Sequence, residues 1–426
     1  MSERHVALLC FYDPAGVHTV VETIAYLQSL SRHGVHVVNL FHERFSFDDI
    51  ALKPTVDFDQ YDAIVLHNTL AYNVENLRTL DRHLRVKLRQ FGGTKILMKQ
   101  DENFRFRELA HYIGDTGFDV IFTCLPPEAI AQVYPPQQVG SPRFIRMLTG
   151  YVTPQLRART APIGTRPVDI FYRGSVQPLS FGRLAYEKRS IGEEVRTRLC
   201  DAGLVLDISS RWEDRVAGEA WFAALGNAKV TLGAESGASI FDLDDTLAAR
   251  CAQAEQALGP MDDSATYAEA YLQFLAPLEN DVRYHQIAPR HFEAVAMRTV
   301  QWLLPGEYSG ILQPHRHYFP LARDFSNLPE ALALLSDPAR CAAMTEAAYH
   351  EIILNPDYAI ERFVTIFDAV IAEGCAARPH QGCTRLAPRV WRMRIALTHT
   401  AFVFRRAALK LLPLALKRWL HARFKA

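Results

Sequence analysis

The amino-acid sequence predicts an α/β fold with two Rossmann-like domains, each built on a doubly wound parallel sheet. Short apolar runs, typical of strands that are buried on both faces, alternate with amphipathic helical segments. This alternation stops at a linker and then begins again. At 426 residues, the chain is too long for one ordinary core and fits two domains with an appendage.

Residues 1–153 are expected to form the first domain. Its first apolar run, residues 6–11, is followed by turn residues and by a helical pattern in which Val17, Val20, Ile24 and Leu27 share one face. The further strands are expected at residues 35–40, 63–67, 95–99 and 119–123.

Residues 154–167 have the composition of a linker, and the pattern restarts directly after them. We expect a second domain over residues 168–374, with a helical insertion at about 243–284. Its strands are expected at residues 168–172, 204–208, 229–232 and 300–304. Asp242, Asp244 and Asp245 are interpreted as an exposed turn that leads into the insertion.

Open α/β sheets bind their ligands beyond the carboxyl ends of the strands, so the residues that follow each strand are the candidates for a site. In the first domain these include His18 and Asp101; in the second they include Arg173, Gly174 and Ser175. The loop Glu235-Ser236-Gly237 also follows a strand, and its small residues would let a ligand approach backbone amides.

One block carries a family resemblance. Phe292-Glu293-Ala294 begins a predicted helix, a strand at 300–304 follows, and the loops continue through Glu307 to Asn327. This block resembles the retaining GT-B glycosyltransferases, in particular the glycosyltransferase-group-1-like or spore-maturation-protein-like branch. The resemblance extends over roughly residues 6–370, and implies two domains facing a cleft that binds a nucleotide-diphosphate sugar.

The resemblance implies roles for individual residues. It places Glu293 against the sugar nucleotide, and Arg173 and Lys188 on its phosphates. The family has a second glutamate eight positions later that holds the ribose, but Gln301 stands there. Either Gln301 makes a weaker contact, or Glu307 takes the role, or another group holds the ribose.

Two residues of the first domain are candidates for the acceptor side. His18 resembles the acceptor-side loop of the family, and Asp101 lies where some relatives place a group near the reacting carbon. An inverting enzyme would need such a group as a general base. The structural alternatives are a helix cap for Glu293, a cap or turn residue for Asp101, and surface positions for Arg173 and Lys188.

The zero net charge conceals a basic C-terminal tail over residues 375–426. From Arg385 onward there are eleven basic residues and no acidic one, so the rest holds 47 − 11 = 36 basic against 47 acidic residues, about −11. An acidic body disfavours nucleic acid as a partner. The tail is expected to form an amphipathic helix on an anionic membrane surface, broken near Pro413. Packing against the acidic body is the alternative.

We expect no metal and no cofactor besides the nucleotide-sugar substrate, because no spacing typical of metal ligands occurs. Seven scattered cysteines indicate a reduced, cytoplasmic protein. The hypothesis from the sequence is a glycosyltransferase at the inner face of the cell membrane, acting on a lipid-linked or cell-surface glycan precursor. Its rivals are a sugar-nucleotide epimerase or hydrolase, and a catalytically inactive membrane-bound scaffold.

Overall fold

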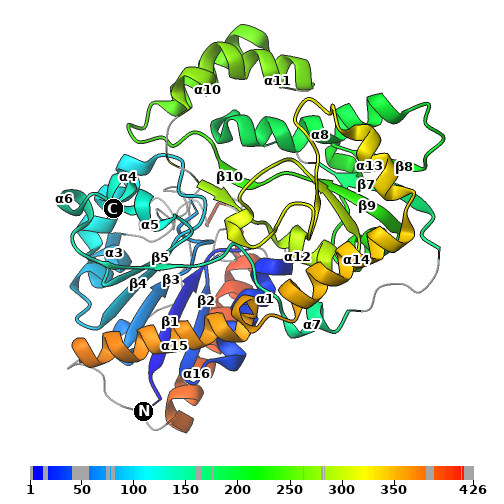
Figure 1. Ribbon diagram of the computed structural model, residues 1–426. Coiled ribbons are helices and arrows are strands. Elements are labelled where there is room, and N and C mark those ends of the chain that lie inside the picture. Colours follow the sequence, from blue (N-terminus) through cyan, green and yellow to red (C-terminus); the bar gives the residue numbers. More distant parts are fainter. Residues whose placement is uncertain are drawn as a thin grey trace.

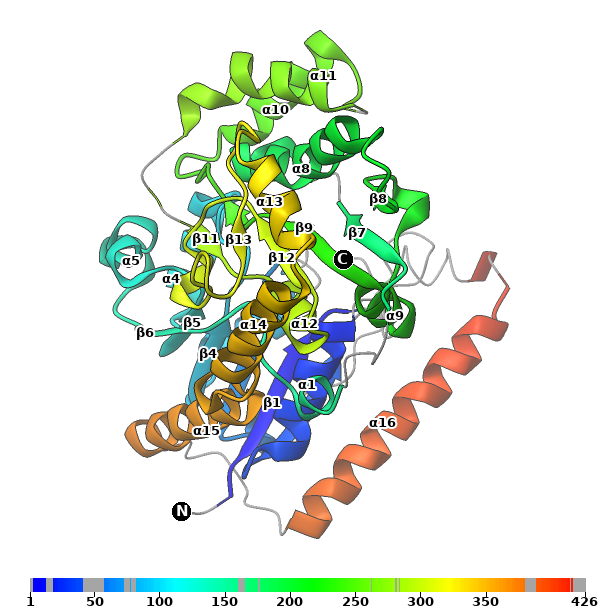
Figure 2. The same cartoon turned by 45° about the vertical axis from the view of Figure 1, so that its right-hand side comes forward.

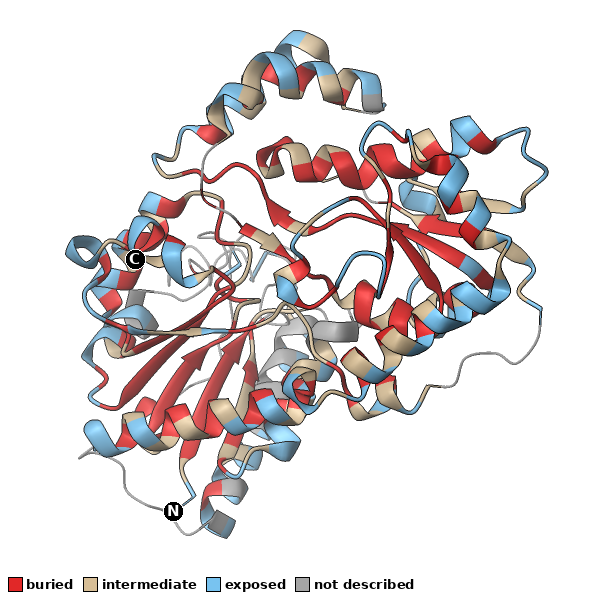
Figure 3. Cartoon of the chain, viewed as in Figure 1, coloured by how far each residue is buried: buried red, intermediate tan, exposed pale blue. Residues whose placement is uncertain are grey.

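The structure is a computed structural model that describes residues 3–12, 18–40, 57–72, 77, 82–159, 165–174, 177–261, 263–279, 282, 284–379, 388–413 and 415–416. Two parallel sheets lie in two α/β units, with helices around each (Figure 1). The fold class predicted from the sequence is confirmed. In both sheets the strands are largely buried (Figure 3).

The first unit contains a six-stranded sheet in the order β2-β1-β3-β4-β5-β6, in which all neighbours are parallel. Its strands are β1 (His5–Cys10), β2 (Gly34–Asn39), β3 (Ala63–Leu66), β4 (Thr94–Met98), β5 (Val120–Thr123) and β6 (Arg143–Arg146). The first five match the predicted apolar runs. The sixth escaped prediction because it is an edge strand, with exposed arginines on either side of two half-buried apolar residues.

The helices of the first unit cover both faces of this sheet (Figure 1). They are α1 (His18–Leu30), α3 (Arg82–Gln90), α4 (Phe106–Thr116), α5 (Pro127–Val133) and α6 (Pro136–Val139), with a 3-10 turn η2 (Phe58–Gln60). Helix α4 ends at Thr116 and is capped by Gly117, whose φ of 67° lets its amide donate to the carbonyl of Ile113.

The second unit contains a five-stranded parallel sheet in the order β13-β12-β9-β7-β8. Its strands are β7 (Val168–Arg173), β8 (Leu206–Ser209), β9 (Ala228–Gly233), β12 (Val300–Leu303) and β13 (Phe319–Pro320). A small antiparallel pair, β10 (Ser236–Ala238) and β11 (Tyr284–Gln286), lies outside this sheet. The order of the strands reverses between β7 and β9, so their carboxyl ends form the edge where a doubly wound sheet binds ligands.

The helices of the second unit include those of the stretch predicted as an insertion. They are α7 (Pro154–Arg157), α8 (Arg183–Leu199), α9 (Glu219–Asn227), α10 (Leu247–Leu258), α11 (Ser264–Ala270), α12 (Pro289–Ala296), α13 (Leu328–Leu335) and α14 (Pro338–Ala348). Short helical turns are η3 (Leu179–Phe181), η4 (Trp212–Asp214), η5 (Tyr271–Leu275), η6 (Ala276–Leu278), η7 (Tyr308–Gly310), η8 (Tyr349–Ile353) and η9 (Pro356–Tyr358).

The aspartates before the insertion connect the two units. Asp242 is only 2% exposed and accepts hydrogen bonds from the amides of Arg105 and Leu247. Asp245 accepts from the amides of Arg107 and Glu108, in the first turn of α4. The prediction of an exposed turn is therefore wrong for Asp242, which is buried. The carboxylates of Asp242 and Asp245 connect the two units because they accept hydrogen bonds from backbone amides at the start of α4 in the first unit.

Helix α15 (Ile360–Ala377) returns to the first unit. Its residues Phe363, Phe367 and Ile371 are buried in the core of the first sheet, where Phe363 and Phe367 contact Phe122. This stretch was predicted to belong to the second domain, and that prediction is wrong because its apolar face packs in the first core. The outgoing and returning segments lie side by side, since the amide of Val152 donates to the carbonyl of Tyr358.

Helix α16 (Pro388–Leu411) is a long helix on the outside of the first unit, and Trp391 near its start belongs to the first core (Figure 2). It ends at Leu411, two residues before Pro413, as the proline predicted. Among the described residues, no helix combines the length and apolar character that crossing a bilayer requires. The predicted tail positions 380–387 and 417–426 lie outside the described residues.

Candidate functional site

A cavity of about 200 Å³ lies between the two units, at the carboxyl ends of strands from both; we call it the central cavity. Its walls come from the loop after β4, from α8, from β10 and β11, and from the start of α12. It is lined by Tyr72, Gln100, Asp101, Thr149, Gln177, Phe181, Lys188, Ser236, Gly237, Tyr284, Gln286, Pro289 and Arg290. Four of the predicted site residues, Asp101, Lys188, Ser236 and Gly237, therefore share one cavity.

Two cations give the central cavity a positive excess. Lys188 lies on α8 and is buried. Its pKa is lowered to about 7, mainly because it is buried and secondly because the positive charge of Arg290 lies nearby. Within the described part of the chain, no carboxylate comes within ion-pair distance of its ammonium group. Arg290 donates through Nη2 to the carbonyl of Ala234, while its buried Nε has no hydrogen-bond partner among the described residues.

Asp101 is the carboxylate of this cavity and comes from the first unit. Burial raises its pKa, against the opposing charges of Lys99 and Lys188. Its backbone is left-handed, with φ of 55°, and its amide donates to the hydroxyl of Tyr284 at 3.0 Å. Lys99 fixes this loop from below, because its ammonium donates to the carbonyls of Tyr72, Gln100 and Asp101, each at 3.1 Å.

Glu235 precedes the cavity residues Ser236 and Gly237 but does not line the central cavity itself, and its carboxylate stabilises a neighbouring loop. Its side chain is 3% exposed and accepts from the amides of Glu307 and Tyr308 at 2.8 and 2.7 Å. Its other oxygen is 2.8 Å from His285 Nδ1. These bonds hold a loop whose residues Tyr308 and Ser309 have φ of 45° and 58°, an unfavourable region for such residues.

Arg173 is directed away from the central cavity. Its guanidinium donates to the carbonyls of Asp214, Tyr172 and Asp207, and to the Asp207 carboxylate at 2.6 Å. These contacts hold β7, β8 and η4 together. Gly174 packs equally tightly, since an added Cβ would lie 2.6 Å from Ser210 Oγ. The geometry does not support the predicted phosphate contact by this turn, and Ser175 lies outside the described residues.

Gln301 and Glu307 do not line any of the cavities described here. Gln301 is 2% exposed within β12, and its side chain reaches only toward the carbonyl of His291, at 3.5 Å. Glu307 has an exposed side chain. The alternatives for holding a ribose with either residue therefore find no support in this geometry. His18 is the first residue of α1, and its side chain lies outside the described residues.

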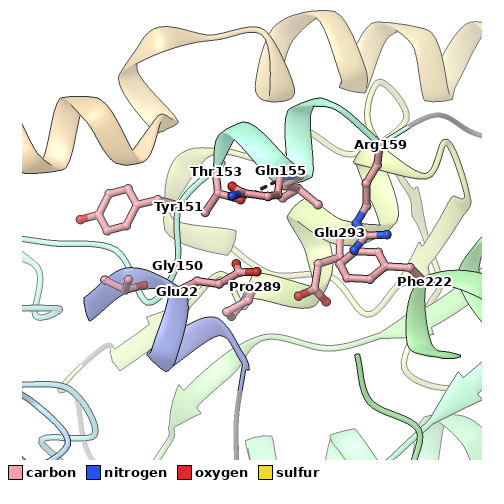
Figure 4. Close-up of a pocket in the computed structure, with 11 residues that line it drawn as sticks. Glu22, Gly150, Tyr151, Thr153, Gln155, Arg159, Phe222, Pro289 and Glu293 are labelled. Carbon is pink, nitrogen blue, oxygen red and sulfur yellow. Dashed lines mark hydrogen bonds between the residues drawn. The ribbon is translucent and has the colours of Figure 1, made fainter. Parts of the chain in front are cut away.

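Glu293 lines a smaller cavity of about 40 Å³ (Figure 4), which shares only Pro289 with the central cavity. Its carboxylate accepts a hydrogen bond from Trp221 Nε1 at 2.8 Å. Burial raises its pKa, and the carboxylate of Glu22 on α1 adds to this effect. Arg159, which lies 3.4 Å above the ring of Phe222, partly offsets it. A cavity of this size has room for a few waters rather than a sugar nucleotide.

A third cavity, of about 280 Å³, adjoins the central one and lies mainly against the first unit. The two cavities share Gln100, Thr149 and Pro289. His67, at the end of β3, lines the third cavity, and burial lowers its pKa to about 3. Its Nδ1 accepts from the amide of Thr69 at 3.2 Å, so the neutral ring carries its proton on Nε2.

Arg290 was not among the site residues predicted from the sequence. A signal was present, because Pro289-Arg290 puts a cation into the first turn of a helix, where the helix dipole disfavours it. An anion bound at the helix N-terminus would remove that conflict.

No family model and no curated protein matches the sequence. Among solved structures, the chain is similar to sucrose-phosphate synthase from Thermosynechococcus elongatus, with TM-score 0.48 and 11% identity over 88% of this chain and 100% of that chain. It is similar to Anabaena HepE in complex with UDP, with TM-score 0.45 and 11% identity over 88% and 100%. AviGT4, a glycosyltransferase involved in avilamycin A biosynthesis, gives TM-score 0.41 and 12% identity over 88% and 98%.

With TM-scores below 0.5, these similarities are too weak to establish a shared activity. The spore-maturation-protein-like branch therefore stays a prediction. The strand orders and the central cavity belong to the chain itself. By its own topology the chain is an α/β protein with two units, each built on a parallel sheet.

Proposed function

We propose that the protein is a glycosyltransferase that takes a sugar from a nucleotide-diphosphate donor bound in the central cavity. The observation that carries this proposal is the pair Lys188 and Arg290, a buried and a half-buried cation that line one cavity with Asp101, a carboxylate of the opposite unit. A leaving nucleoside diphosphate bears concentrated negative charge. Cations and the N-terminal amides of α12 stabilise such charge without a metal.

In this proposal the bond between the sugar and the diphosphate breaks, and an acceptor hydroxyl bonds to the same sugar carbon. The diphosphate leaves toward Lys188 and Arg290. The acceptor would lie in the adjoining third cavity, where His67 and Gln100 offer polar groups. Asp101, which lines the central cavity next to this junction, is the candidate to take the hydroxyl proton.

We further propose a lipid-linked or cell-surface glycan precursor as the acceptor, and hence a role in polysaccharide biosynthesis. The acceptor's lipid would place the enzyme peripherally on the cytoplasmic face of the membrane. The basic tail supports this location, with eleven basic and no acidic residues from Arg385 onward.

Calorimetry with nucleoside diphosphates and the matching nucleosides tests the donor assignment. Lys188→Ala removes a charge-assisted contact, so it should weaken diphosphate binding at least about tenfold and leave nucleoside binding unchanged. Arg173→Ala is the matched control: it removes a cation that is bound to Asp207 and should lower stability without selective loss of diphosphate affinity.

The result also separates the rival functions. A scaffold would bind neither ligand in the unsubstituted protein. A hydrolase or epimerase would bind the diphosphate too, so it is distinguished by incubation with the nucleotide-diphosphate sugar, which it would convert in the absence of any acceptor. Equal loss of affinity in both variants, or no loss in Lys188→Ala, would contradict the phosphate assignment.

A further inference from the structure

One face of α16 is anchored to the first unit. Trp391 is 5% exposed, and its ring stacks on His5 with centroids 4.1 Å apart and meets the edge of Tyr61 at 6.4 Å. One turn later, Ile395 packs against the first core. The helix therefore starts firmly attached at the amino ends of β1 and β2, where His5 and Gly34 lie.

The opposite face of α16 exposes a line of large apolar side chains, which we call the outer stripe. Its members are Val390, Met393, Leu397, Phe404 and Leu411, which are 43, 58, 62, 70 and 86% exposed. At 3.6 residues per turn, all five fall within an arc of about 60°. Trp391 and Ile395 lie roughly opposite this arc, so the stripe points away from the body.

Basic residues flank the outer stripe. Arg389 precedes it on one side and Arg394 lies on the other, both exposed, and Arg394 reaches Asp57 at 3.9 Å. The whole helix contains no acidic residue. A surface helix of a soluble monomer seldom shows five aligned large apolar side chains, so the stripe indicates a partner that combines an apolar layer with negative charge.

We propose that the outer stripe lies in the headgroup region of an anionic lipid bilayer, with the flanking arginines at the lipid phosphates. A second copy of the chain is a poorer partner, because two such helices would bring arginines and lysines together with no carboxylate to offset them. The body is a poorer partner too, because the stripe faces away from it. This inference rests on the proposed membrane location and identifies its contact surface; it does not depend on the donor chemistry.

Sedimentation of the full chain with phosphatidylglycerol vesicles tests the proposal, with phosphatidylcholine vesicles in parallel. Leu397→Glu and Phe404→Glu should each lower the partition onto phosphatidylglycerol at least about tenfold, because burial of these side chains is lost and a like charge is added. Leu272→Glu is the matched control: it changes a 66% exposed leucine of the insertion in the same way and should bind like the unsubstituted chain.

Thermal melts of the variants establish that each is folded, and both stripe positions are exposed, so folding should be retained. High salt should release part of the bound protein, because it screens the charged component. The proposal is overturned if the full chain does not sediment with phosphatidylglycerol at low salt, or if Leu397→Glu and Leu272→Glu bind equally. It is also overturned if the stripe variants convert a dimer to a monomer without affecting sedimentation. The affinity for nucleoside diphosphate should be equal in all these variants. A failure of the membrane test would therefore leave the donor assignment unaffected, and a failure of the donor test would leave the membrane contact unaffected.

Discussion

Lys188 and Arg173 illustrate how the surroundings of a residue decide its role. Both are cations near the start of the second unit, and the same family resemblance predicted that both would bind the phosphates of the donor. Arg173 has its hydrogen bonds satisfied by Asp207 and by backbone carbonyls, so it stabilises β7 and β8. Lys188 is buried at a cavity wall beside Arg290, where its charge lacks a paired carboxylate among the described residues. An unpaired buried cation is costly unless a ligand compensates it.

The pH dependence of donor binding should report on Lys188. Its pKa is lowered to about 7, so in the ligand-free protein this group loses its charge as the pH rises above neutral. Between pH 7 and 9, where a terminal phosphate is already ionised, affinity for a nucleoside diphosphate should fall by up to about tenfold per pH unit. Lys188→Arg keeps its charge and should give a flat profile. Parallel profiles for the two proteins in calorimetric titrations would contradict the assignment.

Glu293→Gln should separate stability from activity. Burial raises the pKa of Glu293, so its ionised form destabilises the folded state at neutral pH. Glutamine can still accept the Trp221 hydrogen bond, so we expect the melting temperature at pH 7 to rise. The stability advantage of the variant should shrink as the pH falls through the raised pKa, because protonation then neutralises Glu293 too. If Glu293 acts on the donor, as the family resemblance implies, transfer should also fall at least about tenfold, about 1.4 kcal/mol; its position outside the central cavity predicts no such loss. Unchanged turnover would limit Glu293 to a structural role.

Among the elements, α15 and α16 depart most from a simple division of the chain into two halves. Both come from the C-terminal part of the sequence, yet both contact the first unit, through Phe363 and Phe367 in one case and Trp391 in the other. Their sequences carry helical periodicity, but periodicity does not identify the surface on which a helix packs.

Trp391→Ala should release α16 from the body. The substitution removes the stack on His5 and the contact beside Gly34, and truncation of a buried tryptophan typically costs about 3–5 kcal/mol. Hydrogen exchange in α16 should accelerate at least about tenfold, while exchange in β1 and β3 stays close to its original rate. Phe404→Ala, at a 70% exposed position of the same helix, is the control and should change neither. Equal protection of α16 in Trp391→Ala would show that other contacts hold the helix.

At the scale of the molecule, the two units depend on each other through the chain crossings. The segments at Val152 and Ala359 are paired. Helix α15 follows the second unit in the sequence but contributes side chains to the core of the first unit. The central cavity also needs both units, since Asp101 and Lys188 come from different ones. A folded, ligand-binding fragment that consists of the first 153 residues is therefore not expected.

Two truncations test this dependence. A chain ending at residue 379 loses the tail and keeps α15, whereas a chain ending at residue 359 loses both. We expect the longer one to melt cooperatively and to bind nucleoside diphosphate. The shorter one should lose the fold of the first unit, because Phe363, Phe367 and Ile371 each contribute about 1.5–3 kcal/mol of burial. Similar thermal unfolding of the two chains would show that α15 is dispensable.

The sequence by itself determined the positions of nine strands and the two-unit α/β architecture. Strands buried on both faces read as continuous apolar runs, and this signal is local and needs no knowledge of partners. The sequence also identified strand ends that approach the site, including Asp101 and Ser236, and the family resemblance added Lys188 on α8.

Only the tertiary structure decided which candidates face a common cavity. Arg173 binds Asp207 instead of lining the cavity, and Gln301 is buried within β12. Arg290, which was not predicted, lines the central cavity together with Lys188. The direction of a side chain depends on strand register and on partners distant in the sequence, so spacing along the chain cannot fix it. The same reason applies to α15 and to the outer stripe, because the face that a helix buries is set by the surface it meets.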